Sequence, residues 1–166
     1  MFFSIIHEIG HIIIGLLLKM KPEKIEIMPF GLNVSFYSNF EDNISQVKEI
    51  FVALAGPITS FLLAILCQAQ QAIYSNILIL LFNIIPIYPL DGGRILKGIL
   101  QIKFGIIQSK MIINKISYIT IIILTIISSI SVYYYKNIAI FMVCIFLWIL
   151  VLQEKNDKTL AILQGK

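Results

Sequence analysis

The sequence predicts an all-α polytopic membrane protein with about five transmembrane helices and a short membrane-associated β-hairpin after the first. Hydrophobic residues make up 58% of the 166 residues and charged residues only 13%, against about 25% charged residues in a soluble domain. The mean hydropathy is +0.91. Apolar runs of near-spanning length recur along the chain. We therefore expect a multi-pass protein of the cell membrane.

Five apolar runs are the expected spans. A helix needs about 20 residues, at about 1.5 Å per residue, to cross the hydrocarbon core. The first run is at the short end of that requirement, and the third is interrupted by Pro86 and Pro89. The runs cover residues 1–18, 50–69, 77–90, 112–132 and 138–152.

Residues 25–37 are the expected hairpin. Ile25-Glu26-Ile27 and Val34-Ser35-Phe36 alternate apolar and polar side chains on either side of Pro29-Phe30-Gly31, which is the pattern of two strands joined by a turn. We divide the chain into three parts. These are a core that carries the sequence motifs (1–110), two additional transmembrane helices (111–153) and a polar cytoplasmic tail (154–166).

The positive charge follows the expected topology. The formal net charge is +4, and the basic residues flank apolar segments, which favours contact with anionic lipid over binding of nucleic acid. With five spans, the basic residues of the first loop, of the segment after the third span and of the tail fall on one side, and Lys136 alone falls on the other. The positive-inside rule places the basic side in the cytoplasm.

His7 and His11 are the two histidines of the chain, and they lie four residues apart in His7-Glu8-Ile9-Gly10-His11. Residues at i and i+4 share one helix face, so both imidazoles can reach one cation. Zinc accepts histidine nitrogen at about 2.0–2.1 Å. In such motifs the glutamate after the first ligand acts as general base on water that the metal activates. We therefore expect one zinc ion per chain, with Glu8 as the base.

A chance match and a transporter site are the two alternatives to a zinc protease at the histidine motif, and both are less favoured. A chance match on a solvated helix does not suit neighbours that are Ile, Phe and Leu, because uncoordinated Glu and His in a bilayer-spanning helix cost several kcal/mol. A metal or proton transporter would need more acidic or histidine residues in the later spans, and residues 112–132 and 138–152 contain none.

Asp91 is the candidate third ligand. A catalytic zinc needs a third protein ligand and an open position, and Asp91 is the one carboxylate outside the first helix that directly abuts an apolar span. Pro86 and Pro89 break the helix before it, and irregular backbone at membrane depth occurs only where protein buries it or where it lines a wet cavity. The alternative is that Asp91 caps the following helix. Because the histidine pair lacks a third ligand, we favour metal ligation by Asp91 over helix capping.

Asn83 is the other polar group of the third span. Its amide could hold substrate backbone or stabilise an oxyanion. Equally, it could form a hydrogen bond between helices. The sequence leaves both roles open.

Four motifs together resemble the site-2 protease family of intramembrane zinc metalloproteases, and most of all the branch of the stage IV sporulation protease FB. They occur in the family's order, and the last is the most specific. The motifs are His7-Glu8-Ile9-Gly10-His11, Met28-Pro29-Phe30-Gly31, Leu54-Ala55-Gly56-Pro57 and Asn83-Ile84-Ile85-Pro86-Ile87-Tyr88-Pro89-Leu90-Asp91-Gly92-Gly93-Arg94.

The resemblance implies a zinc-dependent endopeptidase that cuts membrane-embedded proteins in regulated intramembrane proteolysis. It implies zinc on His7, His11 and Asp91, Glu8 as general base, and Asn83 as an aid to catalysis or substrate positioning. The expected partners are a membrane-spanning protein substrate and the bilayer, without nucleic acid, and a regulatory membrane partner is left open. In the family the hairpin takes up the substrate as an added strand.

Two departures from the family pattern support a different interpretation. The family usually has a transmembrane helix before the histidine helix, whereas six residues precede His7 here, so we expect upstream sequence to be missing. Ser60 stands where the family often has Asn, four residues after Gly56. The alternative is a catalytically inactive or truncated homologue that acts as a membrane interaction module.

Overall fold

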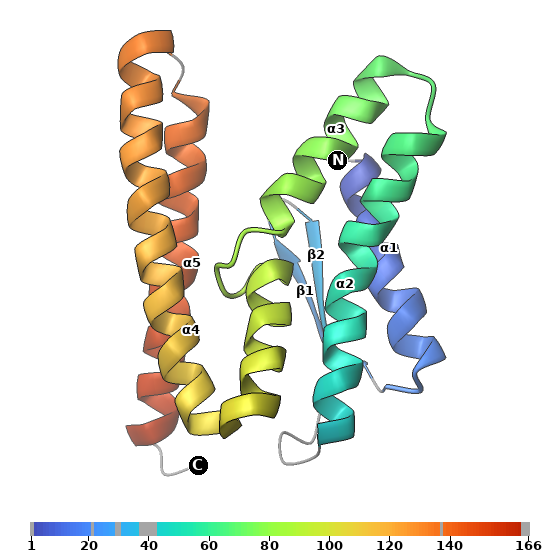
Figure 1. Ribbon diagram of the computed structural model, residues 1–166, viewed down its shortest axis with the longest axis vertical. Helices are drawn as coiled ribbons and strands as arrows, with labels where there is room; N and C mark the ends of the chain where they lie inside the picture. The colour runs from blue at the N-terminus through green and yellow to red at the C-terminus, as the bar shows by residue number, and fades with distance from the viewer. Residues whose placement is uncertain (1, 21, 29–30, 37–42, 137, 164–166) are drawn as a thin grey trace.

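The computed structural model describes residues 2–20, 22–28, 31–36, 43–136 and 138–163. The described part holds five helices and a two-stranded sheet (Figure 1). In chain order the elements are α1 (Phe2–Leu17), β1 (Pro22–Met28), β2 (Gly31–Phe36), α2 (Asn43–Leu66), α3 (Gln70–Asn83), α4 (Asp91–Tyr135) and α5 (Ala139–Leu163).

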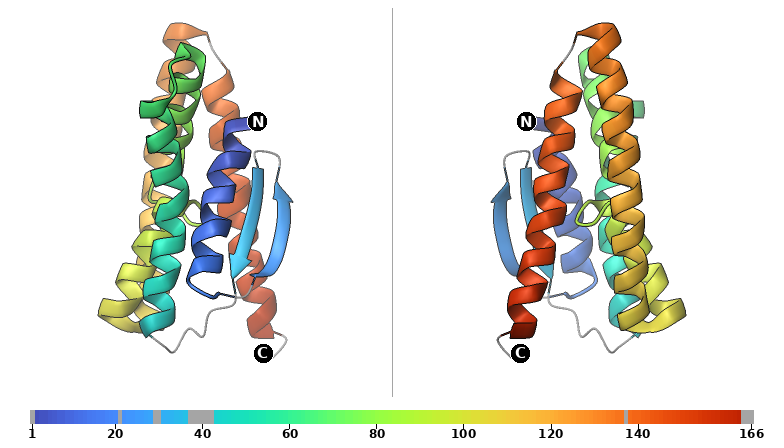
Figure 2. Two further views of the ribbon diagram at one scale, coloured as in Figure 1. Left: turned by 90° about the vertical axis from the view of Figure 1, so that its right-hand side faces the viewer. Right: turned by 90° about the vertical axis from the view of Figure 1, so that its left-hand side faces the viewer.

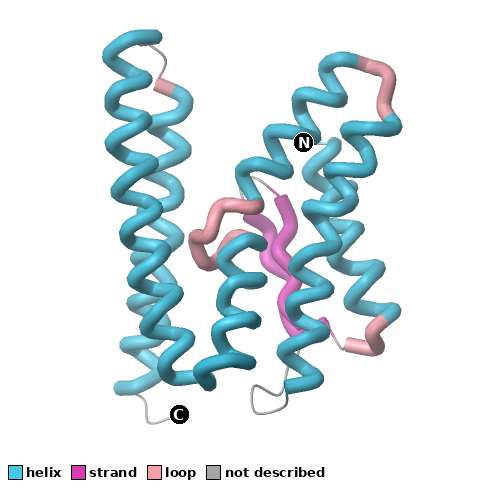
Figure 3. The backbone as a smooth tube through the Cα atoms, viewed as in Figure 1, coloured by secondary structure: helices cyan, strands magenta, loops and turns pink. Residues whose placement is uncertain are grey.

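The elements form two groups. Helices α1, α2 and α3 and the first turns of α4 form one group, with the sheet against α1, while the rest of α4 and α5 run side by side as an antiparallel pair (Figures 1 and 3). The connection between α3 and α4 lies between the two groups. This arrangement brings α1, α2 and the start of α4 together, although they are far apart in sequence.

Helix α1 has one buried face and one exposed, apolar face. Its buried residues are His7, Gly10, His11 and Gly15, whereas large apolar side chains on the other side are exposed. Gly10 lets α2 approach closely, because a Cβ at that position would collide with the Thr59 side chain. An apolar outer face with a polar inner face is the pattern of a membrane helix that lines a site.

The strands β1 and β2 pair antiparallel within the expected hairpin region, with Ile25 opposite Val34 and Glu26 opposite Asn33. The expected turn residues Pro29 and Phe30 lie outside the described residues. Strand β2 packs along α1, as the side views show (Figure 2). The sheet therefore lies beside the helix that carries the histidine motif.

Two of the described helices are long and apolar enough to cross a membrane, namely Ile44–Leu66 within α2 and Asp91–Tyr134 within α4. The apolar helices Phe2–Leu17 and Ile140–Leu152 are shorter. The 16 residues of α1 extend about 24 Å, less than the roughly 30 Å hydrocarbon core. By length, the described part thus supports a membrane protein with two full-length candidate spans rather than about five.

The expected bounds of the third span are wrong. Helix α3 begins at Gln70 and ends at Asn83, so residues 77–90 are only partly helical. Pro86 and Pro89 end the helix because each lacks an N–H and Pro disfavours helical backbone in the residue before it. The polar residues before 77 extend the helix at its other end. A search for apolar residues alone could not have included them.

Helix α4 begins well before the expected span 112–132. It runs from Asp91 through that span as one element, interrupted at Gly105, where φ is 77° and ψ is 174°. That backbone conformation is essentially confined to glycine. Helix α5 continues beyond the expected span 138–152 into the polar tail, whose Gln, Glu, Lys and Leu are good helix formers.

The connection 84–90 is packed between the two groups of elements. Ile87 is fully buried in a cluster with Ile121 of α4 and with Leu147, Leu150 and Val151 of α5. The two cysteines are free, and Cys144 is buried while Cys67 is half-buried, as is common for cysteines that pack as small apolar residues.

Candidate metal centre

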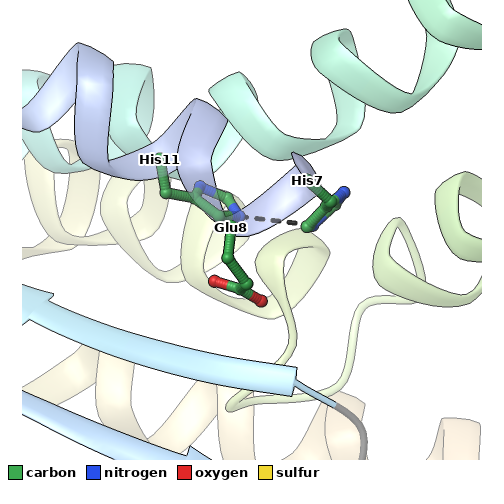
Figure 4. A group of neighbouring side chains, drawn as sticks. All are labelled: His7, Glu8 and His11. Carbon is green, nitrogen blue, oxygen red and sulfur yellow. Dashed lines mark hydrogen bonds between the residues drawn. The ribbon is translucent and has the colours of Figure 1, made fainter. Parts of the chain in front are cut away.

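Two buried imidazoles come from one face of α1. His7 and His11 are 2% and 3% exposed, and their Nε2 atoms lie 3.3 Å apart. The two rings meet edge to face, with centroids 5.0 Å apart (Figure 4). The spacing of four residues therefore brings both imidazoles to one point, as a shared helix face requires.

Asp91 reaches the same point from the first turn of α4. Its Oδ2 lies 3.0 Å from Nε2 of His7 and 3.1 Å from Nε2 of His11. The residue in the N-cap position of α4 is Leu90, and no side chain caps the helix end. The capping alternative for Asp91 is thus not what the structure shows. Its carboxylate meets the two imidazoles instead.

The hydrogen bonds behind the imidazoles set their tautomers. Nδ1 of His11 lies 2.7 Å from the carbonyl oxygen of Val52, which can only accept, so Nδ1 carries the proton. Nδ1 of His7 lies 2.8 Å from Oγ of Ser60, which can accept in the same way. In the neutral imidazoles, both Nε2 atoms then present lone pairs to the carboxylate.

Three lone-pair atoms facing one another need a positive charge between them. Two imidazolium rings with Nε2 atoms 3.3 Å apart would repel each other strongly in apolar surroundings. One divalent cation satisfies all three atoms. Around a tetrahedral zinc with bonds of about 2.0–2.1 Å, neighbouring ligand atoms are about 3.3–3.4 Å apart, close to the separations seen here. The donor set of two imidazoles and one carboxylate therefore fits zinc.

Gly56 of α2 leaves the space for an ion. A Cβ at this position would collide with Nε2 of His11 and would lie 2.5 Å from Nε2 of His7. The α2 backbone therefore passes directly over the two ligand atoms, and glycine is required because any side chain would enter the space between them.

Glu8 stands beside this cluster. A carboxylate oxygen of Glu8 and ring nitrogens of His7 and His11 all lie within 4.8 Å of one another. Its side chain is half-buried and projects from α1 toward the strand in the close-up view (Figure 4). A carboxylate there is near enough to exchange a proton with water at the cluster.

The sequence matches peptidase family M50 over residues 1–75 and 68–127, which together cover most of the chain. The chain belongs to peptidase family M50. The resemblance to site-2 proteases is thereby confirmed.

Relatives of this M50 chain include named metalloproteases. A zinc metalloprotease of Methanocaldococcus jannaschii is 29% identical over 167 residues, covering 92% of this chain and 47% of the relative. Stage IV sporulation protein FB of Bacillus subtilis is 29% identical over 104 residues, covering 55% of this chain and 35% of the relative. The chain thus spans about half or less of these relatives.

A solved structure shares the fold. The site-2 protease from Methanocaldococcus jannaschii matches with a TM-score of 0.70 and 26% identity, covering 92% of this chain and 73% of that chain. The elements that carry the M50 cluster therefore belong to a known arrangement of helices.

The connection before Asp91 folds tightly onto the start of α4. A Cβ on Gly92 would collide with the carbonyl oxygen of Ile84, and a Cβ on Gly93 would collide with the backbone of Ile87 and Tyr88. The two glycines of this M50 motif thus allow the proline-broken backbone to lie against the helix that it precedes. This contact fixes where Asp91 begins α4.

Asn83 ends α3 and donates from Nδ2 to the carbonyl oxygen of Ile79, 3.0 Å away in its own helix. Among the described contacts, this bond leads into α3 and not to the histidine cluster. The half-buried position leaves its amide oxygen as an acceptor. A role in catalysis for Asn83 stays a prediction.

Two residues of the M50 site could not be assigned a function from the sequence. Gly56 stands out there only as part of a motif, and Ser60 only as a departure from a family pattern. Their contacts with the histidines depend on how α2 packs on α1, and nothing local in the sequence specifies that packing. A small residue every fourth position in α2, as at Gly56 and Ser60, is the available signal of close helix packing.

Proposed function

We propose that this chain is a zinc-dependent endopeptidase that hydrolyses peptide bonds of membrane-embedded proteins. The observation that carries the proposal is the convergence of Nε2 of His7, Nε2 of His11 and Oδ2 of Asp91 within 3.0–3.3 Å, with Glu8 beside them. Membership of a peptidase family supports hydrolysis over metal storage or transport.

His7, His11 and Asp91 would hold the zinc ion. Bound zinc would supply a Lewis acid that activates water and polarises the substrate carbonyl. The hydrogen bonds of the two Nδ1 atoms, to Ser60 and Val52, orient the rings so that both Nε2 lone pairs face inward.

Glu8 would move the proton. Its carboxylate accepts a proton from the attacking water and returns it to the nitrogen of the departing amine. The water oxygen joins the carbonyl carbon as the C–N bond breaks, so one water is consumed for each peptide bond. A half-buried position lets Glu8 reach water while it remains next to the ligands.

The substrate would bind as an extended strand along the sheet. A helical peptide bond is shielded by its own hydrogen bonds, so the substrate must unwind before it is cut. A two-stranded sheet has free backbone groups along its outer edges, and a strand added there gains main-chain hydrogen bonds. The packing of β2 along α1 places the sheet near Glu8. Asn83 would help to hold the substrate backbone near the cluster.

The protein would cross the cell membrane several times, with α2 and α4 as the full-length spans and the shorter apolar helices beside them. At one end of the molecule lie the turn after α1, the start of α2 and the bend near residue 105. The α2–α3 and α4–α5 turns lie at the other end (Figure 1). This separation suits an orientation with the basic segments in the cytoplasm. Membrane proteins would be its substrates in regulated intramembrane proteolysis.

Replacing Glu8 tests the proposed reaction. The full chain and its Glu8→Gln variant would be co-expressed with a panel of single-span membrane proteins. The Glu8→Gln variant should keep its zinc and lose cleavage by about 10²-fold or more, because the general base is gone. Glu49→Gln, which changes a carboxylate of α2 outside the cluster, is the control and should cleave normally.

The same experiment separates the proposal from the alternative of an inactive interaction module. Cleavage that persists in Glu8→Gln would refute the role of Glu8. A wild-type chain that binds zinc but cuts no member of the panel would favour the interaction module.

A further inference from the structure

The connection 84–90 has a hydrogen bond to a distant helix. The backbone N–H of Tyr88 donates to Oγ of Ser117, 3.1 Å away in the second half of α4, and Ser117 is 2% exposed. Backbone that leaves a helix within a membrane must find partners for its N–H groups, because lipid offers none. Ser117 is the partner of an N–H that lies only three residues before Asp91.

The bond of Ser117 differs from those of the other serines described along the same half of α4. The hydroxyls of Ser109, Ser128 and Ser129 donate to carbonyls three or four residues back in their own helix. Such bonds are what an isolated hydroxyl makes in an apolar helix. The contact of Ser117 instead joins residues 29 apart in sequence.

Apolar packing holds the connection from the same side. Ile87, next to Tyr88, is 0% exposed and lies in the cluster formed with Ile121, Leu147, Leu150 and Val151. The second half of α4 and α5 therefore contact the connection through both a hydrogen bond and a buried side chain.

The first turns of α4 hold the connection from the other side. The ammonium of Lys97 lies 3.4 Å from the hydroxyl of Tyr88 and 4.4 Å from the centre of its ring. Gly92 and Gly93 allow the backbone of residues 84–88 to lie directly against the helix. Tyr88 is thus fixed between the two halves of α4, and a shift of its backbone would be passed on to Asp91.

We propose that Ser117 is a positioning residue of the metal centre. Its hydroxyl oxygen accepts a hydrogen bond from the N–H of Tyr88 and thereby fixes the connection 84–90. The fixed connection in turn holds Oδ2 of Asp91 next to the Nε2 atoms of His7 and His11. The proposal rests on the proposed zinc peptidase function. It also gives the second half of α4 a part in the site that is separate from crossing the membrane.

Zinc affinity of the full chain in lipid nanodiscs, measured by competition with a chelating dye, tests the proposal. Ser117→Ala should weaken zinc binding by about five- to tenfold, the effect of losing one hydrogen bond that orders a ligand. The cobalt-substituted form of Ser117→Ala should have a visible absorption spectrum that differs from that of cobalt-substituted wild type, because the geometry at Asp91 has changed. Ser117→Thr keeps the hydroxyl and should restore both values.

Ser129→Ala is the matched control, because Ser129 lies on the same helix and its hydroxyl bonds to a carbonyl within that helix. The positioning role would be overturned if Ser117→Ala had the same zinc affinity and the same cobalt spectrum as Ser129→Ala. A Ser117→Ala variant with only a lower melting temperature would also overturn it. A wild-type chain that binds no zinc would overturn the proposed function, and this inference with it.

Discussion

Nδ1 of His7 lies 2.8 Å from the hydroxyl oxygen of Ser60, across the interface between α1 and α2. The imidazole is buried on a helix whose other face is apolar, and Ser60 is 0% exposed. With a metal ion on Nε2, Nδ1 would carry the ring proton and donate it to this hydroxyl, which would hold Nε2 toward Asp91. The orientation of the His7 ring in the metal site therefore depends on the packing of α1 against α2.

Removing the Ser60 hydroxyl should weaken the site without unfolding the protein. Ser60→Ala leaves Nδ1 of His7 without its acceptor, and we expect zinc affinity to fall by about tenfold, as for other partners of metal-bound histidine. Chelator competition would measure it. Ser75→Ala, which removes a hydroxyl bonded to the carbonyl of Gln71 in its own helix, should leave zinc affinity unchanged. Equal effects of the two variants would contradict this role.

A methyl group at position 56 should exclude the metal. Because a Cβ on Gly56 would collide with Nε2 of His11, Gly56→Ala should abolish zinc binding while helix content, followed by circular dichroism, stays close to wild type. Gly98→Ala is the comparison, since its Cβ would collide with the side chain of Ile50 and not with a histidine, so a clash between helices alone should leave zinc affinity unchanged. Zinc binding by Gly56→Ala with wild-type affinity would show that the ion does not lie between the two imidazoles.

Gly105 should be required for stability and not for the metal. Its φ of 77° and ψ of 174° suit glycine alone, and no atom lies within 4 Å of a Cβ placed there. Gly105→Ala should therefore lower the free energy of unfolding by about 1–3 kcal/mol through backbone strain, as measured by denaturant unfolding in detergent. Gln108→Ala, at an exposed position nearby, should have little effect. Wild-type stability in both variants would show that the bend at residue 105 does not require glycine.

Zinc should stabilise the folded chain through Asp91. At a free zinc concentration about 100 times the dissociation constant, binding adds about 2.7 kcal/mol to the free energy of unfolding. A chelator should therefore lower the melting temperature of wild type. Asp91→Asn loses the charged ligand and should melt at the same temperature with and without chelator. If chelator lowers the two melting temperatures equally, Asp91 is not a ligand.

Local patterns in the sequence predicted the three side chains that the structure brings together at the candidate site. The four-residue spacing of His7 and His11 was enough to place both imidazoles on one face. Asp91 followed from its position after a proline-broken apolar run, because a histidine pair needs a third ligand. The alternating residues around Val34 predicted strands where the structure has them.

Contacts between distant segments could not be predicted in this way. Ser60 lies 53 residues from His7, and Ser117 lies 29 residues from Tyr88. Both contacts depend on which helices pack together and at what height, and each serine looks like any small residue in an apolar helix. The early start of α3 was missed because its first turns are polar, whereas helical backbone bonds form regardless of side-chain polarity.

X-ray absorption at the zinc edge of the purified full chain tests the central claim most directly. We predict one zinc per chain, with two imidazole nitrogens and a carboxylate oxygen at about 2.0–2.2 Å, and loss of the oxygen ligand in Asp91→Asn. A chain that purifies without zinc, or a zinc shell that is the same in wild type and Asp91→Asn, would contradict a site built from His7, His11 and Asp91.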